Sequence, residues 1–146
     1  MTDREEAIVK RRMTGKDFFD TNVLVYAIME NDSRKVRARE LLASGGVISA
    51  QVLNEFVSVV RRKVQMSWKD VREALQWIRI LCPDPVPLTI DIQESALTIA
   101  EVYGYGIHDA LIAAAAIEAG CGILYSEDFQ DGQVIEHTLT VRNPFQ

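Results

Sequence analysis

Short apolar runs alternate along the chain with longer segments in which apolar residues recur every three or four positions. The apolar stretch at residues 23–29 predicts a short strand that runs into a helix. The other short runs predict buried strands at residues 18–19, 47–48 and 123–125, an edge strand at 86–88 around a proline, and a weak strand near 134–135.

The longer segments carry signals for helix starts and ends. Polar side chains suited to cap a first helical turn, at residues 31–33, Ser49 and Ser67, predict three helix starts. We expect the first of these helices to bury Val36, Leu41 and Leu42. Two further helices are predicted, one before Gly104 and one at residues 107–119. This alternation predicts an α/β layer architecture with a mainly parallel sheet, whose ligand site lies beyond the carboxyl ends of the strands.

Composition places the chain among ordinary globular proteins. It has 146 residues, 48% of them hydrophobic and 25% charged, which suits one domain and excludes a collagen-like or wholly disordered chain. Cys82 and Cys121 lack metal-binding or redox spacing and predict buried, reduced thiols. No apolar run reaches the roughly 18 residues of a membrane span, and no apolar segment of a signal peptide follows the basic residues 10–12. We expect a cytoplasmic protein with an N-terminal extension at residues 1–16, disordered or loosely held, and one domain at residues 17–146.

Charge is distributed unevenly along the sequence. Residues 1–79 hold 15 of the 16 Lys and Arg residues together with 11 of the 21 acids, whereas residues 80–146 hold ten acids and only Arg142. One explanation is a solvated acidic face. The other is that some acids converge on a cation instead of on basic side chains.

Four carboxylates lie where this architecture places a site. Asp20 follows the first strand, Asp128 comes three residues after the strand at 123–125, and Asp109 lies in the first turn of an alanine-rich helix. Each of these has an ordinary explanation as a turn or helix-start residue. Glu55 is harder to explain structurally, since it lies on an apolar helix face. If the four acids meet, their repulsion calls for a hard divalent cation, and oxygen ligands favour Mg²⁺ or Mn²⁺.

Four segments together resemble the PIN-domain nucleases, and most closely the toxins of bacterial VapBC toxin–antitoxin systems. They occur in the family's order from Phe18 toward the C-terminus, and each contains one of the four acids: residues 18–27 with Phe18-Phe19-Asp20-Thr21-Asn22, then Asn54-Glu55-Phe56, His108-Asp109-Ala110-Leu111, and Leu124-Tyr125-Ser126-Glu127-Asp128-Phe129.

The resemblance implies a PIN-like three-layer α/β/α sandwich with a short, mainly parallel sheet. It also implies an Mg²⁺- or Mn²⁺-dependent endoribonuclease that cuts RNA, forms a homodimer and is blocked by an antitoxin protein. The residues carried over as catalytic and metal-binding are Asp20, Glu55, Asp109 and Asp128. By the same resemblance, Ser126 supports the acids through its hydroxyl, Asn22 and Asp131 are auxiliary or turn residues, Glu127 faces solvent, and His108 has no catalytic role.

The basic half of the chain offers contacts for an RNA backbone. Such contacts would not read sequence, and the alternative is a solvated helix surface. The candidates are Arg34, Lys35, Arg37 and Arg39 on one helix and Arg61, Arg62 and Lys63 at the end of another.

Other classes with an acid after a first strand fit less well. Haloacid-dehalogenase-type phosphatases need a second Asp where this chain has Asn22, and receiver domains need a late Lys, whereas no Lys follows Lys69. The remaining alternative is a catalytically silent PIN-like domain that binds RNA or protein.

Overall fold

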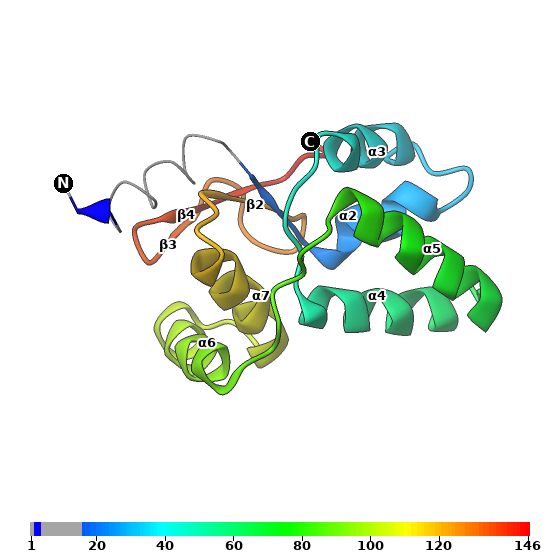
Figure 1. The fold of residues 1–146 in the computed structure, drawn as a ribbon. Coiled ribbons are helices and arrows are strands. Elements are labelled where there is room, and N and C mark those ends of the chain that lie inside the picture. The colour runs from blue at the N-terminus through cyan, green and yellow to red at the C-terminus, as the bar shows by residue number, and fades with distance from the viewer. Residues whose placement is uncertain (1, 4–15) are drawn as a thin grey trace.

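The computed structural model describes residues 2–3 and 16–146 (Figure 1). Most of the predicted N-terminal extension at residues 1–16 therefore lies outside the described residues.

A short, mostly parallel sheet lies at the centre of the fold. Its strands are β1 (Phe18–Phe19), β2 (Ile123–Tyr125), β3 (Val134–Ile135) and β4 (Leu139–Arg142), arranged in the order β1-β2-β4-β3. The pairs β1–β2 and β2–β4 are parallel, and β3 runs antiparallel to β4. Two isolated parallel bridges, Phe18 with Val47 and Ser49 with Val86, extend the sheet beyond β1. The mainly parallel sheet predicted from the sequence is confirmed.

Six helices are described around this sheet, and together they form the α/β sandwich that the sequence predicts. Figure 1 shows α6 and α7 side by side in one group and α2 to α5 in another. Side chains of Ser49, Ser67 and Thr89 accept hydrogen bonds from the first turns of α4, α5 and α6. The helices are α2 (Thr21–Ile28), α3 (Lys35–Ala43), α4 (Ala50–Arg62), α5 (Trp68–Leu81), α6 (Ile90–Tyr103) and α7 (Ile107–Glu118).

The prediction of a strand within residues 23–29 is wrong. The first strand already ends at Phe19, and the extended backbone of Asp20 lets its side chain accept from Thr21 N and cap α2. The whole apolar stretch is therefore helical up to Ile28.

Val36 is also misplaced by the sequence prediction, because it is 68% exposed. The buried positions of α3 are Ala38, Leu41 and Leu42, which are three and four residues apart and share one helix face. Val36 precedes Ala38 by two positions and so points to the opposite side.

Strand β4 is absent from the sequence prediction, although its signal is present. Leu139 and Val141 are buried while Arg142 is exposed, which is the alternation typical of a strand with one covered face.

Close contacts between elements explain several small residues. Helix α7 buries every residue from Ala110 to Ala116. A side chain at Gly46 would come within 2.4 Å of the Phe19 ring.

Cys82 and Cys121 are both free and buried, as predicted, and burial raises the pKa of each thiol, to about 11 and about 12. Within the described residues, every helix is too short or too polar to cross a membrane.

Candidate functional site

The carboxyl ends of β1 and β2 bring two predicted site segments together. Phe19 pairs with Tyr125, and the chain continues directly into Asp20 on one strand and Ser126 on the other. Asp20 N donates to Tyr125 O at 3.0 Å, and Ser126 Oγ donates to Asp20 Oδ2 at 2.6 Å. Because the two strands are parallel, the sheet holds Asp20 and Ser126 next to each other although they are 106 positions apart in the sequence.

Asp20 is the most buried acid of this edge, with 1% of its surface exposed. Its two carboxylate oxygens accept from Thr21 N and from Ser126 Oγ, both at 2.6 Å. Burial is the main cause that raises its pKa to about 7, and the nearby charges of Asp128 and Glu55 add to the rise. The two hydrogen bonds act in the opposite direction.

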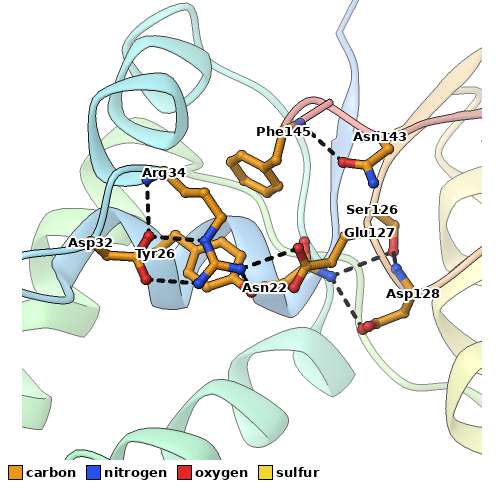
Figure 2. Close-up of polar contacts among 9 residues, drawn as sticks. All are labelled: Asn22, Tyr26, Asp32, Arg34, Ser126, Glu127, Asp128, Asn143 and Phe145. Atoms are coloured by element: carbon orange, nitrogen blue, oxygen red, sulfur yellow. Dashed lines mark hydrogen bonds and ion pairs between the residues drawn. The ribbon is translucent and has the colours of Figure 1, made fainter.

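Asn22 connects α2 to the loop after β2 (Figure 2). Its Nδ2 donates to Asp128 Oδ2 at 3.1 Å and lies 3.5 Å from Ser126 Oγ, which in turn accepts from Asp128 N at 3.0 Å. Its other polar atom, Oδ1, is buried without a hydrogen-bond partner among the described residues. The amide therefore orients Asp128 and leaves one oxygen acceptor unused.

Glu55 reaches the same edge from α4. Its Oε2 accepts from Thr21 Oγ1 at 2.9 Å, and its Oε1 accepts from Gln51 Nε2 at 3.0 Å. The His108 ring lies 4.0 Å from Oε1, with its side chain 74% exposed. Sequence analysis did not identify Thr21 or Gln51 as partners, although Gln51 precedes Glu55 by one helical turn.

Asp109 completes the group from the first turn of α7. Partial burial is the main cause of its raised pKa, and the charges of Asp128 and Glu55 raise it further, while His108 lowers it. Asp128 and Glu55 thus act electrostatically on both Asp20 and Asp109. The structure brings all four predicted acids to one edge of the sheet.

The donor set at this edge suits a hard cation. It consists of carboxylate oxygens and the unpaired amide oxygen of Asn22, which are ligand types that Mg²⁺ and Mn²⁺ accept. Among the described residues, no three acidic, imidazole or thiol side chains lie close enough to hold one ion together. Mg²⁺ usually keeps several of its waters and binds through one or two carboxylates, so the arrangement fits such an ion.

A family model described as PIN domain matches residues 18–130, the region that carries all four acids. The chain belongs to the PIN-domain family. A comparison with curated proteins gave no match.

Two solved structures are similar to this PIN domain. One is VapC20 from Mycobacterium tuberculosis, described as a toxin that cleaves the sarcin-ricin loop; it has a TM-score of 0.62 and 24% identity, over 79% of this chain and 90% of that chain. The other is VapBC2 from Rickettsia felis, bound to a DNA fragment from its promoter; it has a TM-score of 0.61 and 22% identity, over 86% and 98% of the two chains. At these identities the likeness concerns the fold.

Glu127 of the PIN domain does not face solvent freely, contrary to the prediction. Its side chain is 25% exposed and accepts a hydrogen bond from Tyr26 OH (Figure 2). Arg34 stacks on the Tyr26 ring at 3.7 Å, donates to Tyr26 OH at 2.6 Å and lies 3.7 Å from Glu127. Through Glu127, the loop that carries Ser126 and Asp128 is therefore bound to Tyr26 of α2.

Asp32 fixes the guanidinium of Arg34 in this position. Arg34 Nε and Nη2 donate to the two oxygens of Asp32 at 2.9 and 2.8 Å. These hydrogen bonds lower the pKa of Asp32 to about 2, and burial raises the pKa of Tyr26 to about 12.

Asp131 takes a structural role in the C-terminal segment. It is exposed and accepts from Asn143 N at 2.8 Å. Of the two residues predicted as auxiliary or turn groups, Asn22 contacts the acidic edge and Asp131 does not do so within the described residues.

Most of the candidate RNA-binding cations already have partners. Besides Arg34, two of them form ion pairs, Lys35 with Glu30 at 3.1 Å and Arg37 with Glu40 at 3.7 Å. Two others donate to a backbone carbonyl and lie over an indole ring: Arg39 contacts the Ala27 carbonyl at 2.7 Å and Trp77. Arg61 contacts the Met66 carbonyl at 2.6 Å and Trp68.

Proposed function

We propose that this PIN domain is a metal-dependent endoribonuclease, the toxin of a toxin–antitoxin pair, that hydrolyses phosphodiester bonds in RNA. The observation that carries the proposal is the edge at which Asp20, Glu55, Asp109 and Asp128 interact electrostatically although they come from four separate segments. Like charges so placed destabilise one another, and a bound cation removes that cost.

In this proposal Mg²⁺ or Mn²⁺ binds among the four acids, which would hold it through one or two carboxylates directly and through its waters for the others. When bound, such an ion lowers the pKa of its water and offsets the charge that develops on the phosphoryl group. The remaining residues position the acids. Ser126 and the Thr21 amide hold Asp20, the Thr21 hydroxyl holds Glu55, and Asn22 holds Asp128.

The similar structures support the substrate class and the partner. VapC20 is described as a toxin that cleaves the sarcin-ricin loop, and the second structure is of VapBC2. Together with the resemblance to VapBC toxin–antitoxin systems, these names support an RNA target and an antitoxin partner. We extend both features to this chain: RNA as substrate, and a cognate antitoxin that covers the acidic edge, where an Arg or Lys of the antitoxin can replace the ion. A homodimer and a cytoplasmic location belong to the same proposal.

The alternative is a silent PIN-like domain that only binds RNA or protein. The retention of all four acids favours catalysis, because a binding module gains nothing from a buried carboxylate whose pKa is raised to about 7.

Cleavage of a labelled single-stranded RNA by the purified protein tests the proposal. We expect cleavage with Mg²⁺ or Mn²⁺ and none in chelator. Asp20→Asn should lower the rate by well over 100-fold, because residues that only orient a metal ligand already contribute about 10–100-fold. Asp109→Asn and Asp128→Asn should also lose activity.

Asp131→Asn is the matched control. It removes an acid three positions from Asp128, but its side chain contacts the Asn143 amide and can still accept that hydrogen bond. All variants should be purified in parallel. If the three site variants cleave as fast as Asp131→Asn, the activity comes from a contaminant or from another site, and the proposal is wrong.

A further inference from the structure

A cavity of about 380 Å³ lies between α2 and α4, next to two of the four acids. On the α2 side it is lined by Thr21, Val25 and Met29, and on the α4 side by Glu55, Val59 and Lys63. Each set is spaced by four residues, so each forms one row along a helix. The cavity is therefore a groove between two parallel rows of side chains.

The two ends of the groove differ in charge. At one end Thr21 Oγ1 donates to Glu55 at 2.9 Å, with Asp128 nearby in the lining. Lys63 lies eight residues after Glu55, which corresponds to about 12 Å along the helix. Val25, Met29 and Val59 form an apolar stretch between these ends, and Asn22, Tyr26, Arg34 and Glu127 complete the lining.

Two cations line the groove, and only one of them is available to a ligand. The guanidinium of Arg34 is engaged by Asp32 and by Tyr26 OH. Lys63 is exposed, and its side-chain ammonium forms no hydrogen bond or ion pair with any residue in the described part of the chain. Among the cations predicted from the sequence to contact RNA, Lys63 thus combines a free ammonium with a place in this cavity.

We infer that the groove binds one nucleotide of the RNA strand beside the cleaved phosphodiester. The base lies against Val25, Met29 and Val59, and the next phosphate pairs with Lys63. A nucleotide matches the groove because its base has an apolar ring face and its phosphates are anions, one of which pairs with Lys63 and the other with the cation proposed for the acidic end. This inference rests on the proposed function, since the acidic end is taken as the place of cleavage.

RNA binding by variants of the full chain tests the inference. Binding of a short labelled single-stranded RNA is measured by fluorescence anisotropy in the Asp20→Asn background with Mg²⁺, so that cleavage does not interfere. Lys63→Gln should reduce the salt slope, log Kd against log salt, by about 0.7 and weaken binding about fivefold at 0.1 M salt. Lys63→Arg should restore both.

Lys69→Gln is the matched control, because Lys69 is an exposed lysine on α5, six residues away in sequence and outside the lining. It should change neither the affinity nor the slope. If Lys63→Gln behaves like Lys69→Gln, the phosphate contact is refuted.

Filling the groove tests the position of the base. Val59 is half-buried beside the open volume, so in Val59→Phe the ring should occupy the space of the nucleotide. We expect Val59→Phe to weaken RNA binding. Adding Lys63→Gln to Val59→Phe should then weaken binding less than Lys63→Gln does in the Asp20→Asn background alone. A thermal melt checks that the variant folds; should it not fold, Met29→Phe is used instead. Unchanged RNA affinity in a folded, filled variant overturns the inference and leaves the groove to a protein segment.

The outcomes separate this inference from the proposed function. Cleavage that depends on Asp20 together with RNA binding that ignores Lys63 and Val59 refutes the inference alone. RNA binding that depends on Lys63 and Val59 in a protein that never cleaves RNA supports the nucleotide site and refutes the nuclease.

Discussion

The four acids of the site fall into two regions that are held in different ways. At the strand ends, Asp20 is buried and both of its oxygens accept hydrogen bonds from neighbouring protein groups. On the helix side, Asp109 is only half-buried, and its carboxylate accepts no hydrogen bond within the described residues. Asp20 at the strand ends is therefore a fixed reference, whereas Asp109 supplies charge that solvent still reaches.

This difference decides where the energetic cost of the site lies. The burial of Asp20 raises its pKa to about 7, whereas the unfolded chain ionises the same group near its ordinary value of 3.8. The fold thus holds a carboxylate that is partly protonated near neutral pH. Asp109 adds repulsion from a more open position.

The largest expected effect is the pH dependence of stability that Asp20 causes. Below pH 4 the group is protonated in both states and contributes nothing. Between pH 4 and 7 the unfolded chain has lost the proton and the folded chain keeps it, so stability falls as pH rises. A pKa rise from 3.8 to about 7 corresponds to a total loss of about 4 kcal/mol.

Urea unfolding of wild type and Asp20→Asn in chelator measures this effect. The difference in free energy of unfolding should grow in favour of Asp20→Asn from pH 4 to pH 7 and stay constant above it. Parallel curves for the two proteins would mean that Asp20 ionises normally in the folded state.

A smaller effect is expected from Asp109. Asp109→Asn removes one of the repelling charges at nearly constant shape, so we expect it to melt above wild type in chelator. With Mg²⁺ or Mn²⁺ at one hundred times its dissociation constant, wild type should gain about 2.7 kcal/mol, on the order of 5–10 °C. The variant should gain less stability from the metal. The difference in melting temperature between Asp109→Asn and wild type should therefore shrink or change sign.

Melting curves of both proteins with and without metal make this comparison complete. If Asp109→Asn melts below wild type in chelator and still shows the full rise with metal, Asp109 is a helix-start residue. Asp109 would then contribute no charge to the site.

The smallest effect is expected from Asn22, which links α2 to the strand-end loop. Asn22→Ala removes the donor to Asp128 and, at the same time, an amide oxygen that is buried without a partner. The two changes oppose each other, and we expect a net loss of about 1 kcal/mol in the free energy of unfolding. Asn22→Asp is the contrasting variant: it places a fifth charge beside Asp128 and should destabilise more in chelator. Equal stability of the two variants would show that the Asn22 amide does not support Asp128.

Features that depend on neighbouring residues could be predicted from the amino-acid sequence. The run of apolar residues at 123–125 is a strand, the apolar spacing around Glu55 is a helix, and Ser49 and Ser67 cap helices as predicted. The alternation of strands and helices indicated an edge at which the acids could meet, and the resemblance to PIN-domain nucleases then assigned the four acids to one site. The missed strand β4 also had a local signal, the alternation from Leu139 to Arg142.

Only the tertiary structure decided which side chains meet across that edge. Tyr26 and Glu127 are 101 residues apart, and Gln51 and His108 are 57 apart, so no local pattern could pair them. The same holds for the cations: Arg34 and Lys63 look equivalent in sequence, yet Asp32 and Tyr26 engage Arg34, whereas the Lys63 ammonium has no partner among the described residues. Hydrophobic periodicity reports which face of an element is buried. The partner of a polar group depends instead on how separate elements are oriented when they fold together.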